Sequence, residues 1–368
     1  MIAYANPSAQ FKAHQAEIGT AVARVLQGNH YILGPEVEAL EKEFANFIGI
    51  RDAVGVANGT DALELALRGL QIGQGDEVIT VSHTAVATVA AIEAAGAVPV
   101  LVDVDPRFYT LNPSQLTSVI TDKTKAVIAV HLYGQAADLG AIASLCQQNG
   151  IELIEDVSQA HGARWNGQRL GSIGRAACFS CYPTKNLGAI GDAGLVATND
   201  IELGKRIRMI REYGWEERQI SSVVGRNSRL DELQAAILRI KLRYLDGNNQ
   251  KRRELANYYS EQLKSTFLSL PQENSGQSEH VFHLYVVRTN HRDGLLKHLK
   301  GKGIHPGIHY PVPIHLQPAY SGRVRCSDSM DITEDLSKTV LSLPLYPELE
   351  LSQASKVVKA IKEYEQLI

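Results

Sequence analysis

Lys185 stands in a sequence context that suits covalent chemistry. It lies in the run from Cys178 to Gly194, directly after an apolar segment and among Ser, Thr, Tyr and small turn residues. A lysine placed there is expected to be buried beside a ligand with a lowered pKa, because desolvation disfavours its charged form. The unprotonated amine can form a Schiff base. The alternative is a loop lysine that points into water, where most lysines lie.

A second candidate group is in the segment 151–163, where an apolar run ends at Asp156 and is followed by Gln159 and His161. A carboxylate at the carboxyl end of a buried strand points into the crevice where open α/β sheets bind ligands. The functional interpretation is that Asp156 holds a protonated heteroaromatic nitrogen. The alternative is an aspartate that caps the following turn.

The third feature is the triplet Asn58, Gly59 and Thr60, which separates a short apolar run from a helix-like segment. Backbone N–H groups at such a helix start, with the helix dipole behind them, can bind a phosphate. The alternative is a plain N-cap. The presence of all three features in one chain favours a single ligand site over three separate structural roles.

Alternating runs between residues 53 and 198 are expected to position these groups. Short β-branched runs alternate with longer runs whose apolar residues recur every three or four positions, which is typical of a mostly parallel sheet covered by helices. The expected strands are 53–57, 77–81, 98–104, 125–130, 151–155, 176–182 and 194–198, and the expected helices are 61–70, 85–96 and 138–150.

The pattern changes after Asn199 to long charged amphipathic helices at 203–214 and 229–263, the second of which resembles a bridge between domains. The chain is longer than the size at which a single core stops growing. We therefore expect a large α/β domain at 20–245 and a small C-terminal domain at 246–368, with residues 1–19 packed on the small domain.

The composition excludes several classes of protein. A formal charge of -3 gives no electrostatic reason to expect nucleic acid or an anionic membrane as a partner. Four cysteines in 368 residues do not make a disulfide framework and fit a reducing compartment. The N-terminal segment lacks the apolar run of a signal peptide, so we expect a soluble, cytoplasmic protein.

Two patterns that can bind metals are interpreted otherwise. Cys178 and Cys181 form a C-x-x-C in a predicted strand, where side chains three positions apart leave on opposite faces, so we expect packing cysteines. His305, His309 and His315 are separated by prolines and lack a helical or hairpin ligand spacing, so no metal is expected.

Taken together, these segments resemble the DegT/DnrJ/StrS family of sugar aminotransferases. The family's pattern around its cofactor lysine is close to S-F-Y-P-T-K-N-L-G, and residues 180–188 of this chain are S-C-Y-P-T-K-N-L-G. Nearly the whole chain fits, from YILGPEVEALEKEF through GRNSRLDELQAAIL to HYPVPIHLQPAY. The resemblance implies an aspartate-aminotransferase-like α/β fold of type I, with a mostly parallel large-domain sheet and a smaller α/β C-terminal domain. It also implies a homodimer with active sites at the interface.

The cofactor implied by the resemblance is pyridoxal 5'-phosphate. Lys185 would carry it as an imine and would move the proton during catalysis. Asp156 would pair with the pyridinium nitrogen, so that the ring can accept electrons, and Gln159 would contact the ring hydroxyl. The phosphate would be held by Gly59, Thr60 and Ser180, joined by Asn227 from the partner subunit.

The chain departs from the family at the position that usually stacks on the cofactor ring. The family's run is T-[F/W/Y]-x-A-T, whereas Ala85 takes the aromatic position here. His83 is a candidate cofactor contact in its place, although neighbouring residues need not point the same way. The alternative is a plain loop histidine.

Within the family, the chain is most similar to enzymes that aminate C3 of a dTDP-linked 3-keto-6-deoxyhexose. This similarity implies ping-pong kinetics, with glutamate as the amino donor and a nucleotide-linked keto sugar as the acceptor. The alternative for the candidate sugar contacts is a structural role in a connector. These candidates are Tyr31, Asn186, His309, Tyr310 and His315.

Other activities stay open at this point. They are C4 amination of a UDP-, GDP- or dTDP-linked 4-keto sugar, and an epimerase or racemase that uses the same cofactor. A branch of the family that dehydrates deoxysugars has histidine at the lysine position, so Lys185 argues against dehydration. A non-catalytic regulatory protein of this fold would be expected to have lost Lys185, Asp156 or the phosphate site, and all are present.

Overall fold

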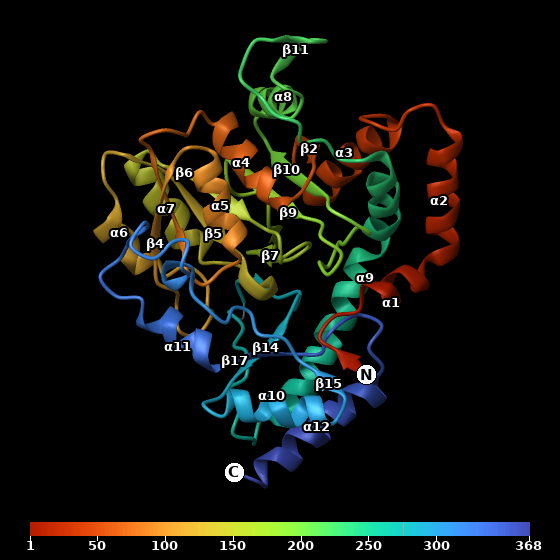
Figure 1. Cartoon of the computed structure of the whole chain (residues 1–368), viewed down its shortest axis with the longest axis vertical. Helices are drawn as coiled ribbons and strands as arrows, with labels where there is room; N and C mark the ends of the chain where they lie inside the picture. Colours follow the sequence, from red (N-terminus) through yellow and green to blue (C-terminus); the bar gives the residue numbers. More distant parts are fainter. Residues whose placement is uncertain (275) are drawn as a thin grey trace.

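The computed structural model describes residues 1–274 and 276–368 and is built around one eight-stranded sheet (Figure 1). The strand order is β16-β4-β3-β5-β6-β9-β10-β2, and β10 alone runs antiparallel to its neighbours in this sheet. The predicted mostly parallel α/β sheet is thus confirmed. The strands are β2 (Asp52–Val56), β3 (Glu77–Val81), β4 (Val98–Val102), β5 (Thr124–Val130), β6 (Glu152–Asp156), β9 (Ala176–Ser180), β10 (Gly194–Thr198) and β16 (Arg325–Cys326).

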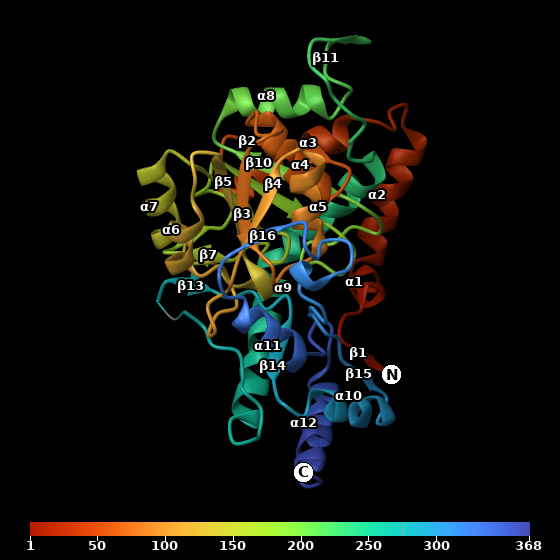
Figure 2. The same ribbon diagram turned by 60° about the vertical axis from the view of Figure 1, so that its left-hand side comes forward.

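The central strands are apolar along nearly their whole length because helices cover both faces of the sheet. Residues 78–81 of β3 and 126–130 of β5 are all buried, whereas a strand with one wet face would alternate. In Figure 2, α8 lies across the top of this sheet. The helices around the sheet are α3 (Pro35–Ile48), α4 (Gly59–Gly69), α5 (Val86–Ala94), η1 (Pro113–Gln115), α6 (Leu116–Val119), η2 (Leu132–Gly134), α7 (Leu139–Asn149) and α8 (Ile201–Ile210).

Helix α9 (Glu232–Leu263) connects the large sheet to a second hydrophobic core (Figure 1). Leu238 and Leu242 of α9 belong to the core of the large sheet, whereas Tyr259 and Leu263 belong to the second core. The second core is built from α10 (Arg292–Gly301), α12 (Leu351–Glu365), the antiparallel pair β14 (Tyr285–Arg288) and β17 (Val340–Leu343), and the parallel pair β1 (Ile2–Ala3) and β15 (Ile304–His305).

The N-terminal residues reach both ends of α9. Ile2 lies in the second core, while α2 (Gln15–Gln27), which follows α1 (Pro7–Ala13), packs on the first half of α9. The packing set consists of Ile18, Ala21 and Val25 with Ala236, Ile237 and Ile240.

The C-terminal segment returns to the large sheet before it completes the second core. Strand β16 pairs with β4, and Ile314 of η3 (Ile314–Leu316) packs with Leu101. Asp103 accepts hydrogen bonds of 2.9 Å from two amides at the start of α11 (Asp331–Thr339). The chain therefore crosses between the two cores more than twice. The predicted boundary between residues 245 and 246 falls inside α9 and stays a prediction.

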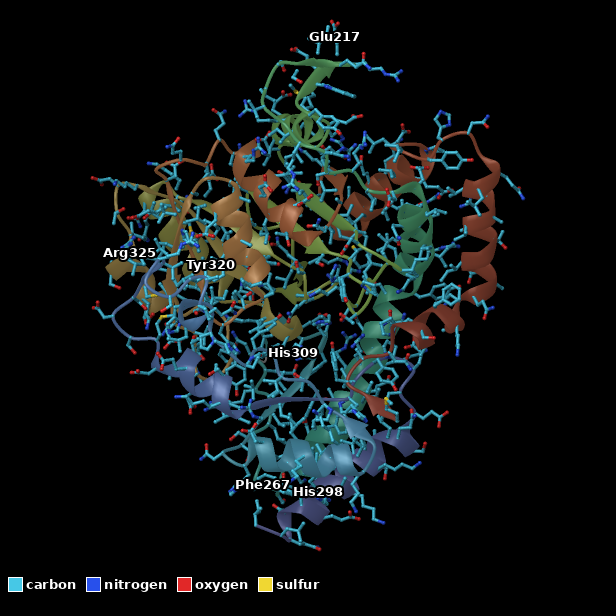
Figure 3. The ribbon with its side chains drawn as sticks, viewed as in Figure 1. Glu217, Phe267, His298, His309, Tyr320 and Arg325 are labelled. Atoms are coloured by element: carbon cyan, nitrogen blue, oxygen red, sulfur yellow. The ribbon has the colours of Figure 1, made fainter. Side chains whose placement is uncertain are left out.

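Two smaller features lie outside the main layers. The antiparallel pair β11 (Trp215–Glu217) and β12 (Ile220–Ser221) projects beyond α8, and Glu217 lies at its outer end (Figure 3). A three-stranded sheet is formed by β13 (Ser278–Glu279), β7 (Arg164–Trp165) and β8 (Gln168–Arg169). Across the described chain, no helix combines the length and the apolar character needed to cross a bilayer.

Glu232 is expected to stabilise the fold through the first turn of α3. Its buried carboxylate accepts N–H groups from Gly34, at 2.8 Å, and from Val37, at 2.9 Å. Glu232→Ala leaves these donors unpaired in the protein, so we expect a loss of about 2–3 kcal/mol in the free energy of unfolding, measured by urea denaturation. The exposed Glu202 is the control, and Glu202→Ala should change it by less than about 0.5 kcal/mol. Equal effects of the two substitutions would contradict the capping role.

Candidate active site

A cavity of about 510 Å³ opens where the parallel strands of the large sheet end. Strands β2, β3, β5, β6 and β9 run in one direction, so the residues that follow them meet at one edge of the sheet. The cavity is lined by Asn58, Gly59, Thr60, Asp61, Leu63, Thr84, Ala85, Ala87, Thr88, Val130, Asp156, Ser158, Gln159, Ser180, Tyr182, Lys185 and Asp192. The sequence-predicted groups Gly59, Thr60, Asp156, Gln159, Ser180 and Lys185 are thus brought together.

One wall of the cavity is the N-terminus of α4. The Asn58 side chain accepts the Asp61 N–H at 2.8 Å, so Asn58 is indeed an N-cap. The first amides of a helix have no intrahelical acceptor, and the dipole of α4 favours negative charge beside them. Capping and anion binding are therefore compatible at this helix start, and Gly59 and Thr60 are the residues that present their amides there.

Gly59 is required by how closely α4 approaches β9. A Cβ atom on Gly59 would lie 2.5 Å from the Cβ of Ser180, and one on Gly194 would collide with the Asn58 carbonyl. Without side chains at these two positions, the start of α4 lies directly on the ends of β9 and β10. The Ser180 hydroxyl and the α4 amides consequently line the same part of the cavity.

Asp156 ends β6 with a buried carboxylate. One oxygen accepts the Ser158 N–H at 3.1 Å and the other accepts the Thr88 hydroxyl at 3.2 Å. These two bonds leave further lone pairs for a protonated ring nitrogen in the cavity. Thr88 was missed by sequence reasoning, although its position on the first turn of the predicted helix after Ala85 was a usable signal.

Lys185 lines the same cavity and is partly buried. Burial lowers the pKa of Lys185 to about 8, while the nearby charge of Asp156 opposes that shift. A larger fraction of Lys185 is therefore an unprotonated nucleophile near neutral pH than of an ordinary lysine. Its amide donates to the Tyr182 carbonyl at 2.8 Å, which closes a turn around the side chain.

The loop that carries Lys185 is anchored to α9. Lys241 donates to the Gly188 carbonyl, and the Asn186 amide donates to Asn249 at 2.8 Å. The oxygen of Asn186 accepts from His283 at 3.1 Å. Asn186, a predicted sugar contact, thus uses its amide inside the protein and does not line the cavity.

Gln159 is fixed from two directions. Its Oε1 accepts the backbone N–H of Tyr133 at 2.8 Å, and its Nε2 donates to the hydroxyl of Tyr310 at 3.0 Å. The side chain nevertheless lines the cavity, so its amide also borders the space predicted for the cofactor ring. His161, two residues later, is buried against Phe179 and does not line the cavity.

The structure does not bring His83 to the cavity. Its ring is buried, and its Nε2 lies 2.7 Å from the Tyr133 hydroxyl. Burial, together with the positive charge of Arg288, lowers the pKa of His83 to about 3, so the ring is neutral. Thr84, Ala85 and Ala87 line the wall instead. Among the described lining residues, Tyr182 is the one aromatic side chain, and it is 52% exposed.

The predicted sugar contacts Tyr31, His309, Tyr310 and His315 lie outside the lining of this chain's cavity. Tyr31 is exposed and donates to the Leu26 carbonyl at 3.3 Å. His309 bonds through Nδ1 to a serine hydroxyl at 2.9 Å, and His315 lies 2.7 Å from one serine hydroxyl and 3.3 Å from a glutamate. Internal hydrogen bonds thus engage Nδ1 of His309 and both ring nitrogens of His315.

The predicted phosphate contact Asn227 is also absent from the lining of its own chain's cavity. It is exposed and lies just after the projecting hairpin of β11 and β12. The next residue, Ser228, is buried and bonds to Asp61 at 2.6 Å, which anchors the segment to α4.

The donor set of the cavity fits pyridoxal 5'-phosphate. The start of α4 and Ser180 provide neutral hydrogen-bond donors for a phosphate dianion. Asp156 provides an acceptor for a protonated ring nitrogen, and Lys185 provides an amine of lowered pKa for an aldehyde. No cluster of His, Cys, Asp or Glu side chains in the described residues has the arrangement of a metal site. Cys178 and Cys181 both lie in the hydrophobic core.

Comparisons with known proteins show the family of the chain. The model of the DegT/DnrJ/EryC1/StrS aminotransferase family matches residues 12–362. A dTDP-3-amino-3,4,6-trideoxy-alpha-D-glucose transaminase from Streptomyces venezuelae is 45% identical over 364 residues, which cover 99% of this chain and 96% of the relative. A UDP-N-acetyl-3-dehydro-alpha-D-glucosamine 3-aminotransferase from Acidithiobacillus ferrooxidans is 43% identical and covers 97% of both chains.

The fold comparison gives the same result. The crystal structure of S. venezuelae DesV in complex with a ketimine intermediate has a TM-score of 0.97 and 45% sequence identity, covering 100% of this chain and 99% of that one. The expected type I fold, aminotransferase activity and dependence on pyridoxal phosphate are thus confirmed. The chain belongs to the DegT/DnrJ/EryC1/StrS aminotransferase family.

Proposed function

We propose that this aminotransferase moves an amino group from glutamate to the C3 keto group of a dTDP-linked 6-deoxyhexose. The observation that carries the proposal is that Lys185 and Asp156 line one cavity whose wall is the N-terminus of α4. Pyridoxal phosphate supplies an electron sink that stabilises negative charge at the donor carbon. The keto sugar then receives the amine in a second half-reaction, which gives ping-pong kinetics.

The chain's own residues hold the cofactor and control where its protons are. The α4 amides and Ser180 bind the phosphate, and Asp156 keeps a proton on the ring nitrogen. Once released by the incoming amine, Lys185 is a base at the donor carbon, a role that its lowered pKa suits near neutral pH. Most side chains that line the cavity are polar, and Leu63 and Val130 contribute buried apolar surface to its wall.

Support for C3 comes from the names of the relatives. Both the S. venezuelae and the A. ferrooxidans relatives are named for amination at position 3, although their nucleotides differ. We therefore propose C3 ahead of C4, and dTDP ahead of UDP as the nucleotide. A panel of 3-keto and 4-keto sugars on both nucleotides, with glutamate conversion to 2-oxoglutarate as the readout, decides between these substrates and also separates transamination from epimerisation.

Two further proposals concern the setting of the enzyme. We propose a homodimer with shared active sites, because Asn227 and the apolar side chains of Ile220 and Val224 are exposed on the hairpin segment of a single chain. We also propose a cytoplasmic location, which the free thiols of all four cysteines support.

The experiment that tests the proposed function is an absorbance spectrum of the protein with pyridoxal phosphate before and after glutamate. The wild type should show the band of a lysine-bound cofactor, which glutamate removes, and Lys185→Ala should not form it. Borohydride reduction followed by peptide mass mapping should place the label on Lys185. Lys241 is the internal control, because burial lowers its pKa to about 8 as well. A label on Lys241, or no band, would contradict the proposal.

The lowered pKa of Lys185 predicts the pH dependence of cofactor capture by the apoenzyme. Below about pH 8 the amine is mostly protonated, so the rate should rise about tenfold per pH unit and level off above pH 8. An ordinary lysine would continue this rise to about pH 10. Stopped-flow absorbance from about pH 6 to 10 measures it, and a rise that continues past pH 9 would count against a desolvated Lys185.

Subunit mixing tests whether Asn227 serves the partner's site. Lys185→Ala and Asn227→Ala homodimers should each be impaired. In a mixed dimer, both substitutions then fall on one site, and the other site is intact. Activity should therefore recover to about a quarter of wild type in an equilibrated equal mixture, because half of the dimers are mixed and each holds one intact site. No recovery, with exchange verified by native mass spectrometry, would mean that Asn227 serves its own chain.

A further inference from the structure

The carboxamide of Gln159 has only one possible orientation. The Tyr133 backbone N–H can only donate, so the group 2.8 Å from it must be Oε1. Nε2 then faces the Tyr310 hydroxyl at 3.0 Å. A carboxamide nitrogen carries two hydrogens, and the Tyr310 hydroxyl accepts one of them. The other is available on a side chain that lines the cavity beside Asp156 and Lys185.

Tyr310 belongs to the C-terminal part of the chain, far in sequence from the strands that build the cavity. It lies between β15 and η3, and it packs against the core of the large sheet without lining the cavity itself. The segment is tied to β17, because Gly307 and Ser342 exchange backbone hydrogen bonds of 3.0 and 2.8 Å. The preceding residue, His309, lies between the large sheet and the helices of the second core (Figure 3).

Tyr133 holds the same amide from the other side. It has φ 61° and ψ 0°, a left-handed conformation that is unfavourable for a non-glycine residue. Its hydroxyl donates to the His309 carbonyl and accepts from His83. The loop after β5 and the C-terminal segment are thus bonded to each other, and both are bonded to Gln159.

We propose that Tyr310 is a positioning residue that acts through Gln159, so that the C-terminal segment sets the hydrogen bond between this amide and the cofactor's ring hydroxyl. The inference rests on the proposed function, because it requires a cofactor ring beside Gln159. It adds to that function a route by which the segment between β15 and η3 acts on the cofactor without touching it. Tyr310 has no direct contact with the reacting atoms in this account.

The direction of the effect follows from charge. A hydrogen-bond donor beside the ring oxygen stabilises the negative charge of that oxygen. This stabilisation matters most once the lysine-bound imine has lost its proton, because the imine then no longer donates to the oxygen. A well-oriented Gln159 amide therefore lowers the pKa of that imine. Loss of the Tyr310 hydroxyl leaves the amide less constrained, and the imine pKa should rise.

The test is a spectroscopic pH titration of the lysine-bound cofactor in holoenzyme carrying Tyr310→Phe, a change that removes one hydroxyl. We expect the pKa to rise by about half a pH unit, in proportion to the weakening of one hydrogen bond. The matched control is Tyr259→Phe, which removes a buried hydroxyl that donates to the Pro344 carbonyl at 2.9 Å, away from the cavity. Tyr259→Phe should lower the free energy of unfolding and leave the imine pKa unchanged.

A double substitution shows whether the effect passes through Gln159. Gln159→Ala should raise the imine pKa at least as much as Tyr310→Phe, and the combined variant should match Gln159→Ala alone. Additive shifts, or a Tyr310→Phe titration identical to that of wild type, would overturn the positioning role while leaving the proposed function standing. A wild-type protein with no titrating band would instead overturn both.

Discussion

The parallel register of the large sheet is the constraint on which the site depends. Asp156, the last residue of β6, is paired with Cys178, so β9 continues two residues further to Ser180 at the same edge. The start of α4 is pressed against the same edge through Gly59. A shift of one residue in any of these strands would turn its last side chain to the opposite face of the sheet, and that side chain would no longer line the cavity.

The parts of the site that were predictable from the sequence are those set by a single strand and its following turn. Asp156, Lys185 and the triplet at Asn58 each follow an apolar run. In an open α/β sheet, the residues that follow parallel strands lie at the carboxyl edge, where ligands bind. Tyr182 also belongs to such a turn but was not singled out, because an exposed tyrosine in a turn has no local signature. His83 was considered as a cofactor contact, but its direction depends on Tyr133, which is fifty positions away.

Contacts between distant segments account for what the sequence did not reveal. No local pattern pairs Tyr310 with Gln159, and the two-residue strand β16 is too short to carry a strand signature. The same holds for the link between the Lys185 loop and α9, where Asn186 bonds to Asn249. These polar contacts join segments that are far apart in the sequence, so hydrophobic periodicity gives no sign of them.

The pairing of β16 with β4 has a consequence for how the chain folds during synthesis. Until residues 325–326 leave the ribosome, the outer edge of β4 presents unpaired backbone groups, although most of the large sheet has already been made. The nascent protein therefore carries an open sheet edge, a template for pairing with other chains, from the synthesis of β4 until that of β16.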